Sequence, residues 1–557
     1  MTLATFQQQL KSENIQAFLV TRNNMYIKQD IKDEENMLLH LSGFSGSDGY
    51  MLVTPHKAWL FVDSRYYIQA RLETATNTIE VVDVKSFFPE IIGLLKEQNI
   101  QNLTCNPWCI SISDWNLLKK AQINMIANET LLANKVCPCD DIFEHVLEFA
   151  GKPAQEKCSE IAKLSLENFD AMLITSADIV SWLANLRAKD LEFTPVLRAY
   201  AVLSKNGELK IFSDNCRYKD IMPLSELYAE LKKYADKKIA VDHKTTPQKM
   251  LDYICDTTLV VNMLNPIYLF KLNKNAVELN GFKNAHIRDG VSMVKFLYWL
   301  ENNYQNKTET DIVDKLKSFR KQNDMYFSDS FATIAASAKN AAIVHYHPDT
   351  RNSVTLQENS VLLLDSGAQY FDGTTDVTRT IAIGNPSDEI KNAFTQVLKA
   401  HIKLSSLIFP NNIQAVALDA ICRSELWRYY KNYGHGTGHS VGHFSNVHEY
   451  PFGLSPNNFR TVQENYVTSI EPGYYQENKY GIRIENMVYV EKTDNDDFLQ
   501  FKNLTLVPID KRLINVYLLD NEERNWLNNY HKEVINCLAP HLDSKENIWL
   551  KGVCSPL

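Results

Sequence analysis

Apolar and polar positions alternate with two different periods along the first third of the chain. Short apolar runs typical of buried strands occur at 14–20, 49–55 and 57–63, and apolar residues at helical spacing occur at 65–75 and 88–98. Strands that alternate with helices in this way are typical of an α/β module. The pattern therefore predicts an α/β fold for this part of the chain.

A second stretch of chain is similar to part of the first. Residues 49–67 form a hairpin-like pair of apolar runs, and residues 199–218 have the same shape with Asn206-Gly207 between the runs. Asn-Gly between apolar runs is a strong hairpin signal. The match is explained either by two modules of one fold or by two unrelated α/β modules that both use hairpins. The sequence predicts the second module and leaves its relation to the first open.

The second half of the chain has a different pattern. A long amphipathic helix is predicted at 274–303, strands and turns follow to about residue 510, and a helix with a tail begins at residue 522. The chain has 557 residues, which is too long for one hydrophobic core, since domains usually span about 100 to 200 residues. We expect three domains, at 1–146, 147–270 and 271–557, the last with a helical extension from about residue 510.

Composition and charge exclude several classes of protein. The 45% of hydrophobic and 22% of charged residues are typical of a soluble globular protein, and the net charge of −9 argues against a nucleic-acid partner. We find neither a secretion signal nor an apolar run of about 18 residues, so no membrane association is expected. The ten cysteines form close pairs only at Cys105/Cys109 and Cys137/Cys139, which favours reduced cytosolic thiols over zinc fingers.

A predicted hairpin at 361–383 carries acidic residues where its apolar strands end. Four aliphatic residues lead directly into Asp365, Asp372-Gly373 turns the chain, and Asp376 begins the returning strand. Turn formation explains Asp372 but fits Asp365 badly. Carboxylates at buried strand ends are costly unless they are paired or bound to a cation. We therefore expect Asp365 and Asp376 to lie side by side at one end of the hairpin.

The same arrangement occurs at 466–490. One predicted strand ends at Glu471, and the other, from 481 to 490, carries Glu485 in line with its apolar positions. Charged residues within such a strand are uncommon unless they are paired or functional. The sequence thus predicts a second pair of buried carboxylates.

A glycine-rich segment between the two hairpins, GHGTGHSVGHFSNVHE at 434–449, contains four histidines. His435 and His439 are four residues apart, as in helical zinc peptidases, but each of the surrounding glycines disfavours a helix by about 1 kcal/mol relative to alanine. We predict a loop or strand edge.

The four carboxylates and a histidine of this segment together indicate a metal site. Carboxylates with a single imidazole suit hard or borderline divalent ions such as manganese or cobalt, and bridging carboxylates hold two such ions about 3.5–4 Å apart.

These motifs resemble those of the pita-bread metallopeptidases, and most closely the long, three-domain, cytosolic form of aminopeptidase P. The similarity covers nearly the whole chain. It is strongest in DSGAQYFDGTTDVTRT, HGTGHSVGHFSNVHE and EPGYYQENKYGIRIEN, and it extends to SGFSGSDG, VDSRYYIQA, FTPVLRAYAV and AHIRDGVSMVKFLYWLE. The resemblance implies two creatinase-like α/β modules followed by a pita-bread catalytic domain.

The resemblance also implies a role for each matching residue. Five residues would bind two divalent metal ions, with manganese expected and cobalt or zinc as alternatives: Asp365, Asp376, His439, Glu471 and Glu485. Among them, Asp376 and Glu485 would bridge the ions, and Glu471 would also take part in catalysis. A hydroxide between the ions would attack the first peptide bond.

Further family positions are expected to surround the substrate. His345 and His448 would bind substrate and move protons, since an imidazole titrates near neutral pH. His435, Tyr475 and Arg483 would line the site.

Some residues depart from the family pattern. Asp48, Ser440, Ser445 and Tyr450 each replace a different residue of the family, and His443 stands where relatives have a small residue. For His443 we expect a solvated loop position, not an additional metal ligand. None of these departures removes a predicted ligand, but they affect the shape of the pocket and the substrate preference.

The implied activity is hydrolysis of the bond before proline in peptides with proline in second position, by a cytoplasmic homodimer. A prolidase, which cleaves only Xaa-Pro dipeptides, would have the same metal ligands. The two N-terminal modules favour the aminopeptidase. A third reading, an inactive pita-bread domain used for binding, is disfavoured because all five ligands are present along with His345 and His448.

Overall fold

Two six-stranded sheets with the same strand order form the N-terminal half of the protein. The first has the order β4-β3-β2-β1-β5-β6 and the second β12-β11-β10-β8-β13-β14. The first consists of β1 Phe18–Thr21, β2 Tyr50–Val53, β3 Ala58–Val62, β4 Ile79–Asp83, β5 Asn102–Cys105 and β6 Asn124–Ala127. The second consists of β8 Ala171–Ile174, β10 Tyr200–Ser204, β11 Leu209–Phe212, β12 Ile221–Met222, β13 Lys238–Val241 and β14 Leu259–Asn262.

The strand directions match as well as the order. In each sheet a central strand pairs antiparallel with the following hairpin and parallel with a later strand, as β1 does with β2 and β5, and β8 with β10 and β13. The second hairpin turns at Gly207, whose φ of 80° suits glycine. This agreement confirms two modules of one fold.

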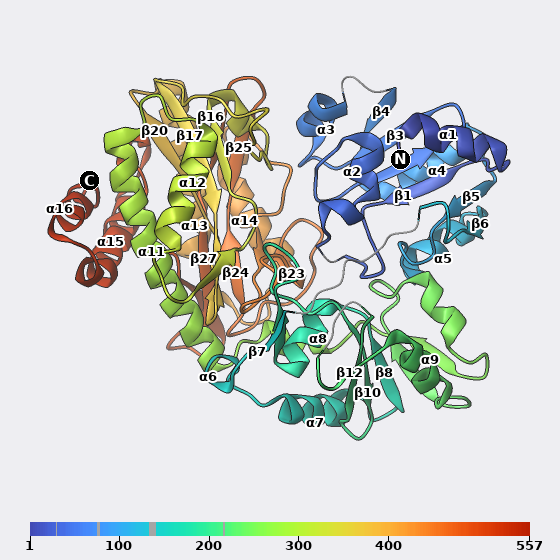
Figure 1. The fold of residues 1–557 in the computed structure, drawn as a ribbon. Helices are drawn as coiled ribbons and strands as arrows, with labels where there is room; N and C mark the ends of the chain where they lie inside the picture. The colour runs from blue at the N-terminus through green and yellow to red at the C-terminus, as the bar shows by residue number, and fades with distance from the viewer. Residues whose placement is uncertain (29, 75–77, 133–140, 215–217) are drawn as a thin grey trace. The chain divides into compact units, whose positions relative to one another are not determined.

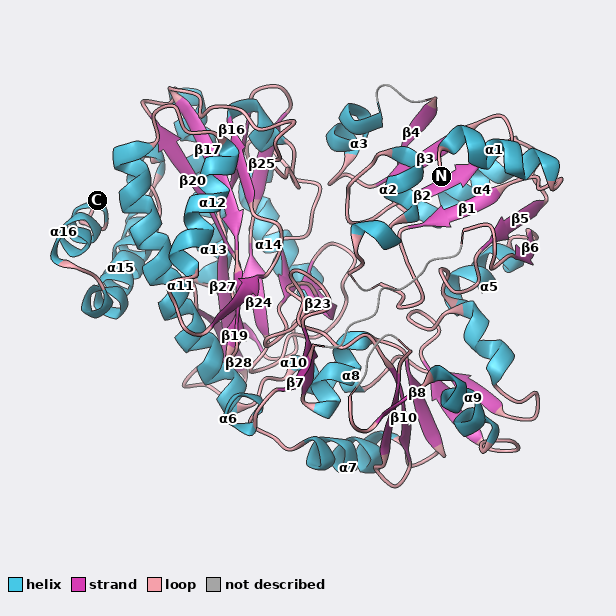
Figure 2. Cartoon of the chain, in the orientation of Figure 1, coloured by secondary structure: helices cyan, strands magenta, loops and turns pink. Residues whose placement is uncertain are grey.

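Helices flank both sheets (Figure 2). The first module has α1 Leu3–Ser12, α2 Met37–Ser42, α3 Tyr67–Thr74, α4 Phe87–Glu97 and α5 Ile112–Lys120, and the second has α7 Ala154–Ser165, α8 Ala177–Ala184 and α9 Leu224–Lys232. Short elements connect the parts: β7 Ile142–Glu144, α6 Leu147–Ala150, β9 Leu186–Ala188 and α10 Ile267–Leu272. The helices predicted at 65–75 and 88–98 correspond to α3 and α4.

The structure, a computed structural model, describes residues 1–28, 30–74, 78–132, 141–214 and 218–557. These residues divide into two units. The first comprises Met1–Leu147, Lys152–Leu191 and Pro195–Tyr268, and the second Glu148–Gly151, Glu192–Thr194 and Leu269–Leu557. The domain boundaries predicted at 146/147 and 270/271 stay a prediction.

The second unit combines several antiparallel sheets with long helices (Figure 1). Its helices are α11 Ala276–Asn303, α12 Glu309–Arg320, α13 Asp388–Ser405, α14 Ala415–Trp427, α15 Asn521–Leu538 and α16 Ser544–Val553. One sheet has the order β16-β17-β20 and another β21-β28-β27-β24-β22-β23. Their strands are β16 Ile334–Ser337, β17 Ser360–Ser366, β20 Val377–Ile383, β21 Ile408–Pro410, β22 Gly438–Ser440, β23 Glu449–Leu454, β24 Val467–Ile470, β27 Asn486–Lys492 and β28 Phe498–Asn503.

Helix α11 begins where the sequence predicts a long helix. The side chain of Asn275 accepts hydrogen bonds from the backbone N–H groups of Val277 and Glu278, and Glu278 completes a capping box. Apolar residues of α11, such as Phe296 and Leu297, are buried in the core of the unit. Helices α15 and α16, at the C-terminal end, contact α11.

The cysteines agree with the prediction as far as the structure describes them. Cys105, Cys109, Cys158, Cys255, Cys422, Cys537 and Cys554 are thiols, not disulfides. The pair Cys137/Cys139 lies outside the described residues. Within the described part of the chain, no helix is both long and apolar enough to cross a membrane.

Candidate metal centre

The first predicted carboxylate pair lies at one end of the β17–β20 hairpin. The two strands pair antiparallel with Asp365 opposite Thr378, and Asp376 immediately precedes β20. Both aspartates are buried. Between them the chain forms β18 Ala368–Tyr370 and β19 Gly373–Thr374, which turn at Phe371-Asp372. The apolar run that precedes Asp365 therefore continues as a buried strand and carries this carboxylate into the interior.

The second pair lies where β24 and β27 meet. Ile470 pairs with Asn486, so that Glu471 directly follows one strand and Glu485 directly precedes the other. The predicted continuous strand from 481 to 490 is wrong. The chain forms β26 Tyr480–Arg483, which pairs with β25 Gly473–Gln476, and then changes partner at Ile484-Glu485 to begin β27. Glu485 occupies this change of partner, and its side chain is 1% exposed.

His439 joins the two pairs. It lies in β22, a short strand inside the sheet between β23 and β24, so the prediction that this segment is not a helix is confirmed, whereas the predicted loop or strand edge is an interior strand. Its Nε2 lies 3.4 Å from Oδ2 of Asp376 and 3.5 Å from Oε1 of Glu471. Its Nδ1 lies 3.1 Å from the carbonyl oxygen of Ser440, which can only accept a hydrogen bond. The proton therefore belongs on Nδ1, and the lone pair of Nε2 is directed to the carboxylates.

The donor set fits a cation. Ligand atoms of Asp376, His439 and Glu485 all lie within 4.8 Å of one another. In addition, Oδ1 of Asp365 is buried and has no hydrogen-bond partner among the described residues. A buried carboxylate oxygen without a partner is unfavourable unless a positive charge completes its surroundings.

The electrostatics of the carboxylates point the same way. Burial raises the pKa of Asp376 well above its usual range, and the charges of Asp365 and Glu471 raise it further. Burial and Asp376 likewise raise the pKa of Glu485 well above its usual range. Burial also raises the pKa of Glu471, although His439 opposes this. Like charges this close cannot all ionise without a cation, and bound cations would remove that repulsion.

Hydroxyl groups orient two of the glutamates. Thr378 Oγ1 donates to Oε2 of Glu485 at 2.8 Å, and Ser469 Oγ donates to Oε1 of Glu471 at 3.2 Å. Neither residue was predicted from the sequence. Thr378 lies two residues after Asp376 and Ser469 two residues before Glu471, so alternation along a strand places each hydroxyl on the same face as a predicted ligand. That spacing was the available signal.

The predicted substrate residues form a hydrogen-bonded chain that reaches the metal centre. His435 Nε2 lies 2.8 Å from the hydroxyl of Tyr475, which accepts from Nη1 of Arg483 at 2.6 Å. Arg483 also donates through Nη2 to Oδ2 of Asp365 at 2.6 Å. The structure therefore brings His435, Tyr475 and Arg483 together beside a predicted ligand.

The other two predicted histidines lie on different segments. The His448 ring lies 4.1 Å from the His439 ring, centre to centre. His345 follows the 3₁₀ turn Ala338–Ala342, and the carbonyl of its neighbour Val344 accepts from Nη2 of Arg483 at 3.3 Å. His448 is thus next to a predicted ligand. The loop that carries His345 is connected to the metal centre through the hydrogen bond between Val344 and Arg483.

The expectation of a solvated His443 is wrong. Its side chain is buried, with 2% of the residue exposed. Its Nε2–H donates to the carbonyl of Asp372 at 2.8 Å, and its ring meets the ring of Phe282 edge to face. This contact holds the turn of the β18–β19 hairpin, where Arg288 also binds the carboxylate of Asp372. His443 is therefore a buried residue that packs against this turn, not a solvated loop residue.

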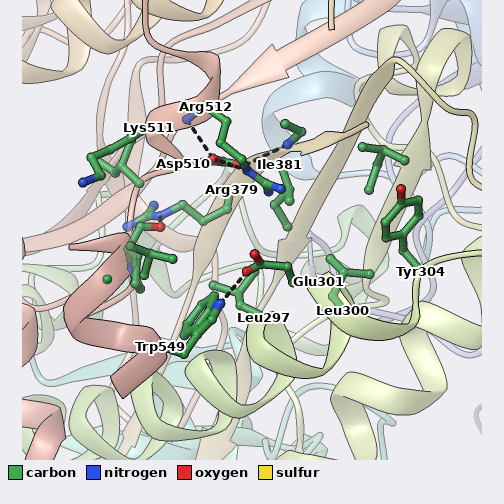
Figure 3. Close-up of a pocket in the computed structure, with 16 residues that line it drawn as sticks. Leu297, Leu300, Glu301, Tyr304, Arg379, Ile381, Asp510, Lys511, Arg512 and Trp549 are labelled. Atoms are coloured by element: carbon green, nitrogen blue, oxygen red, sulfur yellow. Dashed lines mark hydrogen bonds and ion pairs between the residues drawn. The ribbon is translucent and has the colours of Figure 1, made fainter. Parts of the chain in front are cut away.

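A separate cavity of about 260 Å³ lies on the other side of β20 (Figure 3). Arg379 and Ile381 line it together with Trp549 of α16. Thr378, the neighbour of Arg379, is directed to Glu485 instead. Since successive side chains of a strand point to opposite faces, the cavity and the carboxylates lie on opposite faces of β20.

Comparison with known proteins places this geometry in a family. Residues 280–492 match the model of metallopeptidase family M24, and residues 497–557 match the C-terminal region of that family. Residues 3–144 and 133–278 each match a creatinase/prolidase N-terminal domain. The family matches follow the predicted order of two creatinase-like modules and a pita-bread domain.

Proteins that are similar to this chain over their full length support the same family. The chain is 33% identical to a probable Xaa-Pro aminopeptidase P of Laccaria bicolor over 100% of this chain and 93% of that protein. It is 34% identical to Xaa-Pro aminopeptidase 1 of Dictyostelium discoideum over 98% of this chain and 95% of that protein. The crystal structure of X-prolyl aminopeptidase from Caenorhabditis elegans, described as a cytosolic enzyme with a di-nuclear active site, superposes with a TM-score of 0.92 at 30% identity, covering 100% of this chain and 99% of that one. The chain belongs to metallopeptidase family M24 and, within it, to the Xaa-Pro aminopeptidases.

Proposed function

We propose that this protein is a metal-dependent aminopeptidase that removes the first residue from peptides with proline in second position. The observation that carries the proposal is the convergence of Asp376, His439 and Glu485 within 4.8 Å of one another, in a chain similar to Xaa-Pro aminopeptidases along its whole length. An Xaa-Pro bond is a tertiary amide of restricted geometry, so its cleavage requires a dedicated site.

Five side chains are proposed to hold two divalent cations: Asp365, Asp376, His439, Glu471 and Glu485. In this assignment Asp376 and Glu485 would hold both ions, Asp365 would hold one of them, and His439 and Glu471 would hold the other. Two observations support the assignment: Oδ1 of Asp365 accepts no hydrogen bond from the described part of the chain, and the pKa values of Asp376 and Glu485 are raised. When bound, two such ions polarise the carbonyl and lower the pKa of the attacking water.

The surrounding residues are proposed to bind and orient the peptide. Arg483 and Tyr475, which hydrogen-bond to each other, would form one wall of the pocket, with His435 behind Tyr475. His448, against the ring of His439, and His345 would bind the peptide and carry protons between it and solvent. Glu471 has a second proposed role in proton transfer, because it has a raised pKa and faces His439.

The metal in use is proposed to be manganese, with cobalt or zinc as the alternatives. Four carboxylates and one imidazole form an oxygen-rich set, which suits hard or borderline ions better than soft ones. Activity of the stripped protein after addition of each ion in turn would identify it. The account predicts that Mn²⁺ restores the most activity at equal free concentration.

We also propose that the protein forms a homodimer and is located in the cytoplasm. The family expectation supports the dimer, and the description of the Caenorhabditis elegans relative as cytosolic supports the location. Light scattering coupled to gel filtration would test the first, with a mass near twice 63.9 kDa expected.

One assay separates this activity from that of a prolidase. Purified protein with Mn²⁺ is offered Arg-Pro-Pro and Gly-Pro, and the products are followed by mass spectrometry. We expect release of arginine from the tripeptide and little turnover of the dipeptide. Turnover of the dipeptide alone would instead identify a prolidase, and no turnover of either would support a binding module.

A further inference from the structure

One buried carboxylate links three segments of the catalytic unit. Glu449 directly follows His448 and begins β23, and it is 2% exposed. Nζ of Lys271 lies 2.7 Å from its Oε1, and Nζ of Lys274 lies 2.6 Å from its Oε2. The hydroxyl of Ser440 lies 3.1 Å from the same Oε2 and 3.0 Å from the carbonyl oxygen of Val467, and these two acceptors share its proton. The carboxylate therefore joins β22, β23 and the end of α10 with the segment that follows it.

The two lysines and the glutamate are all buried. Burial raises the pKa of Glu449, but Lys271 and Lys274 more than offset this and hold it below its usual value, so the side chain is an anion. Burying three charges is costly even when they are paired. A cluster of this kind is better explained by a requirement for one fixed geometry than by stability alone.

The cluster lies at an irregularity of the sheet. In the β22–β23 pair, His439 is opposite Gly453, whereas the next residue, Ser440, is opposite Glu449. The additional residues of β23 form a bulge, and bulges near active sites reorient side chains. The hydrogen bond from Ser440 to Glu449 closes this bulge, with His439 and His448 next to it and their rings 4.1 Å apart.

We propose that Lys271, Lys274 and Glu449 are positioning residues for His448. By fixing the first residue of β23, the cluster keeps the His448 imidazole against His439 and directed to the substrate. Ser440 adds a further hydrogen bond to the same carboxylate. The kinetic part of this inference rests on the proposed function, and its structural part does not.

A double-mutant cycle tests whether the cluster acts through His448. Glu449→Gln keeps the shape of the side chain but removes its charge. We expect it to lower kcat/KM on Arg-Pro-Pro by about tenfold or more in the wild-type background and by less than about twofold in a His448→Ala background. The same factor in both backgrounds would mean a general structural role and would overturn the proposal.

Two substitutions of one lysine provide a rescue test. Lys271→Arg keeps the positive charge, and Lys271→Met removes it with similar length. We expect the arginine variant to retain most of the kcat/KM that the methionine variant loses. Equal losses would contradict the proposal.

A partly buried ion pair elsewhere in the unit provides the control. Lys399 binds the carboxylate of Glu523 at 2.6 Å, between α13 and α15. We expect both Glu523→Gln and Glu449→Gln to lower the Tm, but only Glu449→Gln to lower kcat/KM. If Glu449→Gln does not fold, Ser440→Ala takes its place in the same cycle, with a severalfold loss expected only when His448 is present.

A measurement on the metal-free protein tests the positioning role without an activity assay. In protein labelled with ¹⁵N-histidine, the imidazole signals of His448 are assigned by their loss in His448→Ala. Glu449→Gln should shift or broaden these signals, and Glu523→Gln should not. Unchanged signals in Glu449→Gln would overturn the positioning role. If the wild type cleaves no Xaa-Pro peptide, the proposed function fails while this measurement still decides the role of the cluster.

Discussion

Arg483 holds one oxygen of Asp365 and leaves the other without a hydrogen bond. Its Nη2 lies 2.6 Å from Oδ2 of Asp365, whereas Oδ1 is buried and has no hydrogen-bond partner among the described residues. The same guanidinium binds the hydroxyl of Tyr475 at 2.6 Å. Arg483 therefore connects a proposed metal ligand with a proposed wall of the substrate pocket.

Replacement of Arg483 by lysine should weaken both metal binding and substrate binding. Lysine is a single point charge and cannot bind Asp365 and Tyr475 with the planar geometry of arginine. We expect kcat/KM to fall by about tenfold to a hundredfold, with weaker metal binding in calorimetric titration. Arg351→Lys, at an ion pair with Asp349 on the surface, is the control and should match the wild type.

Replacement of Glu485 by glutamine should abolish activity and stabilise the metal-free protein. Removing a proposed bridging ligand should lower kcat/KM by about a thousandfold or more. Removing a buried carboxylate that faces Asp376 should raise the Tm of the metal-free protein, because like-charge repulsion is lost. Activity assays and thermal unfolding in EDTA measure the two effects. Retained turnover above trace level would contradict the bridging role.

Replacement of His448 by alanine should lower the rate and leave the metal content unchanged. The ring lies beside His439 but is not among the proposed ligands. Loss of a group that transfers protons costs about a hundredfold to ten-thousandfold in rate. Metal analysis of the purified variant accompanies the kinetics, with the exposed His541→Ala as the control. A variant that lost its metal would show that the role of His448 was misassigned.

The metal-free protein should lose stability as pH rises through the titration of its carboxylates. Asp376, Glu471 and Glu485 have raised pKa values in the folded state, against about 3.9 for Asp and 4.3 for Glu in the unfolded chain. Their contribution is complete below about pH 4 and is lost as pH rises toward the folded pKa values, because the unfolded chain ionises first.

Thermal unfolding in EDTA from pH 5 to pH 8 measures this loss. Because Glu485→Gln removes one of the titrating groups, the Tm of the wild type relative to this variant should fall across the range. Added Mn²⁺ should stabilise the wild type more at pH 8 than at pH 5, since the ligands must lose protons to bind it. A Tm difference that does not change with pH would contradict the raised pKa values.

Strand periodicity and turn chemistry were enough to predict much of the site. The apolar run before Asp365 became β17, the predicted Asp372-Gly373 turn formed one residue earlier at Phe371-Asp372, and the glycines around His439 excluded a helix. These features depend on residues close together in the sequence, so they can be predicted from one sequence alone.

Features that depend on tertiary partners were not predictable. Glu485 lies between two strands because β26 pairs with β25 and β27 pairs with β24, and no local pattern marks that change. His443 is buried because Asp372 and Phe282 come from distant parts of the chain to meet it. The roles of the five proposed ligands came from a family resemblance, because no local pattern assigns a side chain to one ion or the other.

The metal stoichiometry of the purified protein tests the central claim most directly. Protein loaded with Mn²⁺ and freed of excess ion would be analysed by inductively coupled plasma mass spectrometry, alongside the Asp376→Asn variant. The account predicts close to two ions for each wild-type chain and a clear loss in the variant. A wild-type chain that holds no ion, or a variant that holds as many as the wild type, would contradict it.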